Sequence, residues 1–316
     1  MTIWARLKMF SFKNQMQKLL FLTIILIYCA TLFAQVNVSS GSIKRLEKFS
    51  SKYVDARNVD VWLPDGYSAK KKYAVLYMHD GQMLFDATTT WNHQEWQVDE
   101  TVGKLIKEGK IKETIVVGVW NNGDYRHSEY YPQKTLADLP AETRDFIVKN
   151  SLKNKPQADN YLKFLVEELK PYIDKNFSTK KDVKNTFIAG SSMGGLISLY
   201  AICEYPNVFG GAAGISTHLP MVGDAKTPNI ETVSASFRNY LEKNLPKADS
   251  RKIYFDHGDQ TLDAFYPPLQ KKVDEIMKAK GYTEKSWVTR FFSGENHSEI
   301  SWAKRLDVPL VFLLGK

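Results

Sequence analysis

The sequence has 316 residues, of which 43% are apolar and 25% are charged. This composition excludes disordered and fibrous classes, and the length suits one large α/β domain or two small ones. The formal charge is +8, but four basic residues lie in an N-terminal segment without acids, which leaves a scattered +4 that does not predict nucleic-acid binding. Two cysteines, Cys29 and Cys203, cannot build a disulfide framework or a thiolate zinc site.

The N-terminus has the layout of a secretory signal peptide. Residues 19–34 form an apolar run that follows lysines and precedes a polar segment. We expect cleavage after Ala34, so that residues 1–34 (starting at Met1 or at Met16) are a signal peptide and residues 35–316 a single mature domain. The alternative is an N-terminal anchor helix, for which this run is short. The prediction is a secreted or periplasmic protein without stable membrane association after cleavage.

The mature chain alternates between strand-like and helix-like segments. Residues 42–63 predict two antiparallel strands. Short unbroken apolar runs follow, at residues 73–78, 114–120, 186–190, 208–216, 252–256 and 287–292. Such runs predict strands covered on both faces, and residues 161–177 and 267–282 between them have helical spacing. This order predicts an α/β fold with a mainly parallel central sheet and helices on both faces.

Residues 121–158 are the least patterned part of the mature chain. The segment is polar and rich in Asn, Lys and Pro. A long irregular insert in a compact domain usually serves as a lid or a binding loop, and we expect one of these here.

Residues 190–194, Gly-Ser-Ser-Met-Gly, match the pattern G-x-S-x-G between a predicted strand and an apolar helix. A turn this sharp should leave no room for side chains at Gly190 and Gly194, and it should expose the hydroxyl of Ser192 at the helix N-terminus. The alternative is a Gly/Ser-rich turn that only packs the helix closely, but its position between strand and helix favours a nucleophile. Such a serine needs a histidine base and an acid that orients the base.

His297 is the predicted base, by elimination. In sheets with this turn the chain order is serine, acid, histidine, and His297 alone follows the last predicted strand. The other histidines receive lesser roles: His79 and His257 as structural hydrogen-bonding groups, His218 as a lid or pocket residue, and His93 and His127 at the surface.

The acid should follow the strand at residues 252–256, where three aspartates compete. Asp263 is preferred because it lies deep in the loop and could reach a histidine on the next loop. Asp259 follows a glycine and could be a turn residue, and Asp256 belongs to the strand end.

An oxyanion hole requires two fixed backbone N–H groups. We predict the amide of Met193, which follows the nucleophile, and the amide of Gln82 in the loop after the strand at residues 73–78. Gly81 would allow a close approach there. The alternative is that residues 79–82 form a plain surface turn, although loops at this edge of a parallel sheet commonly bind ligands.

Several segments together resemble the putative-esterase (esterase D-like) family of α/β-hydrolases, over about residues 45–315. They are HDGQMLFD, VGVWNNGDYRHSEYYP, GSSMGG, YPNVFGGAAGIS, FDHGDQTLD and ENHSEISW. The family includes feruloyl and acetylxylan esterases, siderophore esterases and mycolyltransferases. The resemblance implies an α/β-hydrolase fold and carboxylic-ester hydrolysis through an acyl-enzyme, with no metal or organic cofactor.

Carried over by position, Ser192 matches the family's nucleophile, His297 its base, and the amides of Gln82 and Met193 its oxyanion hole. Some members carry the acid at the position where this chain has Thr261. The choice of Asp263 as the acid therefore depends on the local sequence and not on the resemblance. The resemblance places Arg126, Glu129 and Tyr130 in the scaffold and pocket rim.

The substrate is indicated by tryptophans and by the predicted secretion. Trp91, Trp96, Trp120 and Trp302 are expected near the carboxyl edge of the sheet, where flat rings suit sugars or aromatic acids, although tryptophans are also common in cores. We predict an esterase that removes acetyl or feruloyl groups from polysaccharide, with a small-molecule or polysaccharide ester as its partner. The alternative is a siderophore esterase acting on an enterobactin-type trilactone; a non-catalytic binder on the same fold is disfavoured by the intact serine, histidine and oxyanion set.

Overall fold

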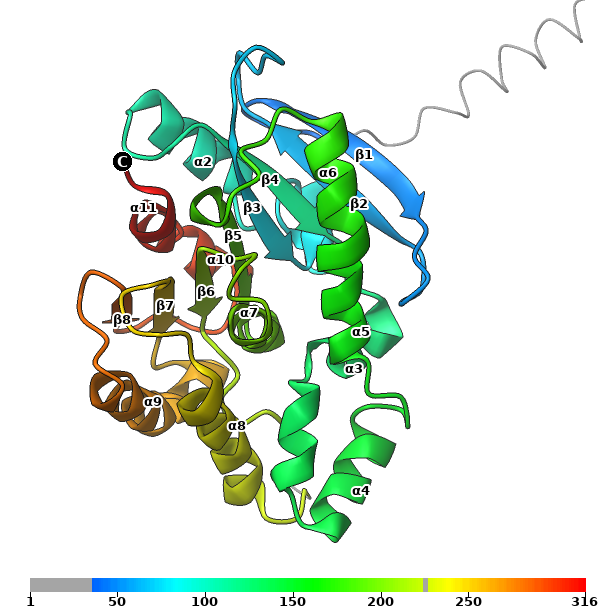
Figure 1. Cartoon of the computed structure of the whole chain (residues 1–316), viewed down its shortest axis with the longest axis vertical. Coiled ribbons are helices and arrows are strands. Elements are labelled where there is room, and N and C mark those ends of the chain that lie inside the picture. Colours follow the sequence, from blue (N-terminus) through cyan, green and yellow to red (C-terminus); the bar gives the residue numbers. More distant parts are fainter. Residues whose placement is uncertain (1–35, 224–226) are drawn as a thin grey trace, which may run out of the picture. The chain divides into compact units, whose positions relative to one another are not determined.

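An eight-stranded sheet runs through the computed structural model (Figure 1), which describes residues 36–223 and 227–316. The strands are β1 (Ser42–Phe49), β2 (Arg57–Leu63), β3 (Ala74–His79), β4 (Thr114–Val119), β5 (Thr186–Ser191), β6 (Gly211–Ile215), β7 (Lys252–His257) and β8 (Trp287–Phe291). Their order is β1-β2-β4-β3-β5-β6-β7-β8. β2 pairs antiparallel with β1 and β4, and all other pairs are parallel. The predicted antiparallel pair and mainly parallel sheet are confirmed.

The central strands are buried on both faces, as their unbroken apolar runs predict. In β3, Val75 and Tyr77 belong to the large core cluster, whereas Leu76 and Met78 are equally buried but lie outside that cluster. Successive side chains of a strand point to opposite faces, so both faces of β3 are covered. The prediction is wrong for β8, which is an edge strand with partly exposed side chains. Phe291 at its end is 56% exposed.

Helices cover the sheet from both sides, as predicted. They are α2 (Val98–Lys107), α3 (Arg126–Tyr130), α4 (Ala141–Asn150), α5 (Ala158–Lys163), α6 (Lys170–Asn176), α7 (Met193–Glu204), α8 (Ile230–Asn244), α9 (Pro267–Ala279), α10 (Glu299–Ala303) and α11 (Asp307–Leu314). Side chains of α5, α6, α7, α8 and α9 join the core cluster. Helix α11 contacts α2, β6 and β7. Its buried Leu310 and Leu313 lie outside that cluster, which places α2 and α11 on the other face.

The predicted helix at residues 161–177 is part of a longer one. A π-helical segment, Phe164–Leu169, connects α5 to α6, and the three form the long green helix in Figure 1. The helix predicted at residues 267–282 corresponds to α9, with Pro267 at its first position.

Residues 121–158 are not the irregular insert that the sequence predicted. They form α3, α4 and two 3₁₀ segments, Gly123–Tyr125 and Gln133–Asp138. Leu136, Ile147 and Leu152 are buried and give these short helices a share of the core. The scattered apolar residues are too few for a periodic pattern, yet they suffice to fix short helical turns.

The chain divides into two units, Met1–Asn37 and Val38–Lys316. The predicted signal peptide lies outside the described residues. Within residues 36–223 and 227–316, no helix has the length and apolar content required to cross a membrane.

The sheet's topology determines where a site can form. The chain moves from β3 to β4 on one side and later to β5 on the other side of β3. Where the strand order reverses, the loops after neighbouring strands separate and leave a crevice at the carboxyl edge. The loops that follow β3, β4 and β5 meet at this edge.

Candidate active site

Ser192 occupies the sharp turn between β5 and α7. Its backbone has φ 55° and ψ −122°, a conformation that residues other than glycine rarely adopt. Its N–H donates to the carbonyl of Ile215 at 3.0 Å, and its own carbonyl accepts from the N–H of His218 at 3.1 Å. These bonds to the end of β6 and to the segment after it hold the strained turn in place.

The predicted crowding at the two glycines is right for one of them. A Cβ at Gly190 would lie 2.8 Å from the backbone of Gly194, so only glycine fits there. A Cβ at Gly194 would find its nearest atom, the Cβ of His79, at 3.4 Å, which is an ordinary contact. The tight position in the turn is therefore 190.

His297 and Asp263 form a hydrogen-bonded pair. His297 lies between β8 and α10, and its Nδ1 is 2.6 Å from Oδ1 of Asp263. Asp263 is fully buried, and its Oδ2 accepts from the hydroxyl of Ser216 at 2.5 Å and from the N–H of Gly258 at 2.7 Å. Burial acts to raise the pKa of Asp263, but the hydrogen bonds from His297, Ser216 and Gly258 outweigh it and hold the pKa below its ordinary value.

The three candidate acids have different surroundings. Of the three, Asp263 is the one that reaches His297. Asp259 is a turn residue whose carboxylate accepts from the N–H of Gly294 at 2.8 Å. Asp256 is buried behind the pair and binds Arg305 at 3.1 Å. Thr261 also contributes, because its hydroxyl accepts from the backbone N–H of His297 at 3.0 Å.

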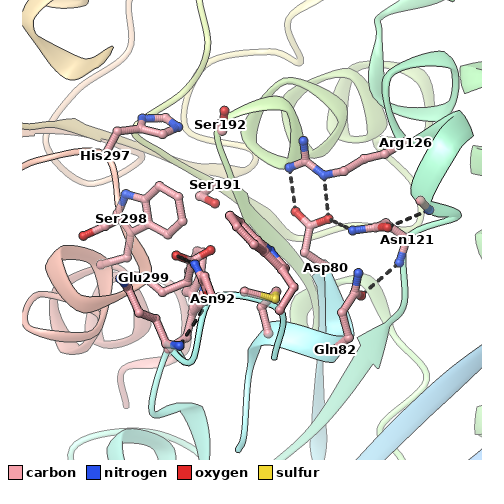
Figure 2. A pocket seen from close by; sticks show the side chains of 16 residues that line it. Asp80, Gln82, Asn92, Asn121, Arg126, Ser191, Ser192, His297, Ser298 and Glu299 are labelled. Atoms are coloured by element: carbon pink, nitrogen blue, oxygen red, sulfur yellow. Dashed lines mark hydrogen bonds and ion pairs between the residues drawn. The ribbon is translucent and has the colours of Figure 1, made fainter. Parts of the chain in front are cut away.

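Ser192 and His297 line the same cavity, which has a volume of about 730 Å³. Figure 2 shows both residues on one side of this cavity, with Asp80, Gln82 and Asn121 on another side. The structure has no direct hydrogen bond between the described residues Ser192 and His297. Such bonds are often long in the absence of substrate and shorten when it binds.

The segment after β3 forms part of the cavity wall and is not a plain surface turn. Asp80 has φ 56°, and residues Gly81–Met83 form a 3₁₀ turn. A Cβ at Gly81 would lie 2.4 Å from the backbone of Gly118 in β4, so the close approach requires glycine. Gln82 and Met193 are early residues of their helical turns, where backbone N–H groups lack an intrahelical acceptor.

Asp80 is held by a clamp that the sequence did not predict. Arg126 binds both of its carboxylate oxygens at 2.8 Å, and the side-chain amide of Asn121 donates to one of them at 2.8 Å. Burial would raise the pKa of Asp80, but Arg126 and Asn121 lower it below its ordinary value. The backbone N–H of Asn121 also donates to the side-chain oxygen of Gln82 at 3.2 Å. Arg126 thus lies at the pocket rim, as the resemblance implied.

Three of the four tryptophans reach the cavity. Trp91, Trp96 and Trp302 line it, and the ring of Trp302 packs edge to face on His297 with centroids 5.0 Å apart. Trp120 does not line it. Its indole N–H donates to Asp60 at 2.8 Å, and the guanidinium of Arg45 covers its ring. The buried Asp60 carboxylate on β2 thus holds Trp120 away from the predicted substrate position.

A second cavity of about 430 Å³ lies on another side of Ser192. His218 lines it, and its Nδ1 is 2.8 Å from the hydroxyl of Tyr266. Burial lowers the pKa of His218 to about 4, so its imidazole is neutral at physiological pH. His127 also lines this cavity and is exposed, as the predicted surface position requires.

His79 and His257 have structural hydrogen-bond partners, as expected. Nδ1 of His79 is 2.8 Å from the hydroxyl of Tyr161, and Nδ1 of His257 is 2.8 Å from the carbonyl of Gly258. Among the described residues, no group of three His, Cys, Asp or Glu side chains has a geometry that could hold a metal ion.

A mainly parallel sheet in this order, with a strained serine turn after β5, defines the chain as an α/β-hydrolase. Within this class the chain belongs to the family described as "Putative esterase", whose model matches residues 50–309. It is therefore a carboxylic ester hydrolase, and the predicted family, fold and enzyme class are confirmed.

Similar proteins include esterases with different named substrates. An endo-1,4-beta-xylanase/feruloyl esterase from Xylanibacter ruminicola is 26% identical to this chain. The match covers 86% of this chain and 31% of that protein. A ferulic acid esterase structure has a TM-score of 0.61 at 21% identity, covering 88% of this chain and 99% of the other. An enterobactin esterase structure from Shigella flexneri has a TM-score of 0.63 at 15% identity, covering 89% and 61%.

Proposed function

We propose that the chain hydrolyses esters with Ser192 as nucleophile, His297 as general base and Asp263 as the acid that orients the base. The observation that carries this proposal is the strained Ser192 turn at the same cavity as the His297–Asp263 pair. The amides of Gln82 and Met193 are the proposed oxyanion hole. These residues come from the segments after β3, β5, β7 and β8 at the carboxyl edge of the sheet.

The reaction would proceed in two acyl-transfer steps. His297 accepts the proton of Ser192 as its oxygen attacks the ester carbonyl, and the two amides stabilise the oxyanion. The alcohol leaves with the proton from His297. Water then attacks the acyl-enzyme in the same way, and its proton passes through His297 as the acid is released. Asp263 keeps Nδ1 of His297 hydrogen-bonded, so that Nε2 is the nitrogen that exchanges protons.

The two cavities beside Ser192 would bind different parts of the substrate. The larger cavity contains His297, and the smaller one does not. Because the leaving alcohol takes its proton from His297, the alcohol should occupy the larger cavity. Tryptophan rings, the amides of Asn92 and Gln94, and the carboxylate of Glu299 line it. Flat rings and planar hydrogen-bonding groups suit a sugar.

The smaller cavity would then receive the acyl group. Its lining includes apolar side chains of Met193, Met221, Val222 and Leu262. A cavity of about 430 Å³ can hold an aromatic acyl group, whereas an acetyl group would leave most of it empty. We therefore propose an esterase that removes feruloyl or acetyl groups from polysaccharide, with feruloyl favoured over acetyl.

We further propose that the enzyme is secreted or periplasmic, with residues 1–34 as its signal peptide. The basic residues, apolar run and Ala34 support this. A polysaccharide substrate outside the cell is consistent with this location.

A second candidate is a siderophore esterase acting on a catecholate trilactone. It is supported by the structural similarity to an enterobactin esterase. The cationic side chains of Arg126 and Lys153 at the smaller cavity also suit catecholate oxygens.

The test compares wild-type enzyme and Ser192→Ala on acetylated xylan, methyl ferulate and a catecholate trilactone. We expect the highest kcat/KM on methyl ferulate, loss of turnover in Ser192→Ala, and labelling of the wild type alone by a serine-reactive phosphonate. Ser236→Ala, a buried serine on α8 that bonds to the carbonyl of Val233, is the matched control. Wild-type hydrolysis by Ser192→Ala would refute the proposed nucleophile, and the highest kcat/KM on the trilactone would favour the second candidate.

A further inference from the structure

Behind the His297–Asp263 pair lies a buried polar cluster formed by Ser216, Asp256, Trp302 and Arg305. Ser216 directly follows β6 and has φ 42°. Its hydroxyl is within hydrogen-bond distance of three partners: Oδ2 of Asp263 at 2.5 Å, Nη2 of Arg305 at 2.7 Å and Nε1 of Trp302 at 3.1 Å. All four residues of the cluster are at most 5% exposed.

These partners fix the direction of the Ser216 proton. A guanidinium and an indole N–H can only donate, and a hydroxyl has one proton and two lone pairs. Arg305 and Trp302 therefore occupy both lone pairs, and the proton of Ser216 must point to Asp263. This leaves Oδ1 of Asp263 for His297.

Asp256 holds Arg305 in the position that this arrangement requires. Nη2 of Arg305 is 3.1 Å from Oδ1 of Asp256 but 3.9 Å from Oδ2 of Asp263. Asp256 also accepts from the N–H of Ser216 at 3.0 Å and from the hydroxyl of Tyr254 at 3.0 Å. The guanidinium is thus paired mainly with Asp256 and contacts Asp263 through the Ser216 hydroxyl. Since little water reaches these groups, their charges are weakly screened.

We propose that Ser216, Arg305 and Asp256 are positioning residues for the hydrolytic reaction, which hold the carboxylate of Asp263 against His297 and set the charge behind the base. Trp302 adds a second link, because it donates to Ser216 and packs its ring on His297. This inference rests on the proposed roles of His297 and Asp263. It extends them to Ser216, Arg305 and Asp256, none of which lines either cavity.

Several charged or titratable groups lie near His297, and a test that changes charge must leave the others in place. Asp263 bonds to Nδ1, and Tyr266 and Trp302 pack on the ring. His218 is close enough to interact electrostatically. Glu299 and the Asp80–Arg126 pair share its cavity, and Asp256 and Arg305 lie behind Asp263. In the cluster, Asp256 and Arg305 can be changed without altering the lining of that cavity.

The first experiment is Ser216→Ala, assayed on methyl ferulate and p-nitrophenyl acetate. Loss of one hydrogen bond to a charged group predicts a fall in kcat of about tenfold with KM within twofold, because substrate contacts are unchanged. Ser236→Ala, which removes a similarly buried hydroxyl from α8, should leave both constants unchanged. Wild-type kcat in Ser216→Ala would overturn the proposal.

The second experiment changes the buried charges and measures the pH dependence of kcat/KM. A loss of stability alone would not shift this dependence. Asp256→Asn removes a negative charge behind the base, so the acid limb of the kcat/KM profile should move to lower pH, by about 0.5 pH unit. Arg305→Met removes a positive charge, so the limb should move to higher pH. Glu129→Gln changes another fully buried carboxylate, paired with Arg57, and should leave the limb in place.

The proposal would be overturned if the acid limb of the kcat/KM profile stays in place in both Asp256→Asn and Arg305→Met. It would also be overturned if the limb moves in the same direction in both variants. If Arg305→Met does not fold, the shift in Asp256→Asn and the kcat of Ser216→Ala still decide. His297→Ala separates this failure from failure of the proposed function. Full activity in His297→Ala would refute the catalytic assignment itself, whereas an inactive His297→Ala with a normal Ser216→Ala would refute the positioning unit alone.

Discussion

Nδ1 of His297 and Oδ1 of Asp263 lie 2.6 Å apart although the two residues are 34 positions apart along the chain. Asp263 is fully buried in the short 3₁₀ segment after β7, and His297 is partly exposed at the cavity. The pair therefore places an imidazole at the cavity with its second nitrogen free and its first nitrogen fixed by a buried carboxylate.

Asp263→Asn should lower kcat by about 10²–10⁴-fold, because an amide can donate to Nδ1 and stabilise the tautomer that cannot accept the serine proton. KM should change little, since Asp263 does not line the substrate cavity. Steady-state rates on methyl ferulate provide the measurement. Asp259→Asn in the same loop is the control and should retain wild-type kcat, because Asp259 contacts Gly294 rather than His297. Equal losses in both variants would contradict the assignment of Asp263.

Arg126→Met should destabilise the fold, by about 3 kcal/mol at pH 7, because it leaves the buried Asp80 carboxylate without its main partner. The Arg126 interaction lowers the pKa of Asp80, so its stabilisation is present above the ordinary aspartate pKa and is lost as pH falls through the lower folded-state value. The difference between variant and wild type should therefore shrink towards pH 3. Urea unfolding at pH 7 and pH 3 measures it. Arg144→Met removes an exposed pair with Asp145 and should change stability by less than about 1 kcal/mol at either pH.

The parts of the fold that the sequence predicted are those with local patterns. Every apolar run became a strand, because a strand buried on both faces requires an unbroken run. The Ser192 turn was also predictable, since its glycine and its place between strand and helix are local features. The prediction failed at β8, where Thr289 and Arg290 interrupt the apolar run and no strand of the described residues pairs with the outer edge.

The parts of the site that the sequence did not predict depend on long-range charge pairs. Trp120 was expected in the substrate cavity, but its orientation depends on Asp60 on a neighbouring strand. The Ser216–Arg305 contact joins residues 89 positions apart, and Arg305 lies outside the segments that carry the resemblance. Asp256 at the end of β7 and Asp259 and Asp263 after it are close in sequence, and their surroundings in the fold distinguish them.

Glu95→Gln should raise the thermal stability at pH 8 and leave it nearly unchanged at pH 5. Burial, with the nearby charges of Glu100 and Asp86, raises the pKa of Glu95 to about 7. A raised carboxyl pKa favours the folded state at low pH, and this contribution is lost as pH rises through 7. Because Glu95 is only half-buried, we expect a Tm increase of about 2 °C at pH 8. Glu275→Gln on the exposed face of α9 is the control for calorimetry, and an equal gain at both pH values would contradict the prediction.

The two cavities beside Ser192 should respond separately to substitution. Trp91 is 82% exposed at the larger cavity, where the alcohol is proposed to bind, so Trp91→Ala should lower kcat/KM about tenfold on feruloylated oligosaccharides and leave methyl ferulate within twofold. Leu262 lines the smaller cavity, so Leu262→Ala should lower kcat/KM about fivefold on methyl ferulate and spare p-nitrophenyl acetate.

Phe291→Ala removes an exposed aromatic ring on β8 outside both cavities and is the control for each series. Parallel losses on all substrates in Trp91→Ala and Leu262→Ala would mean that the cavities do not divide acyl group from alcohol. A reversed pattern, with Trp91→Ala affecting methyl ferulate and Leu262→Ala affecting the sugar esters alone, would place the acyl group on the His297 side. The alcohol would then leave on the side away from His297, and this histidine could not be the group that protonates it.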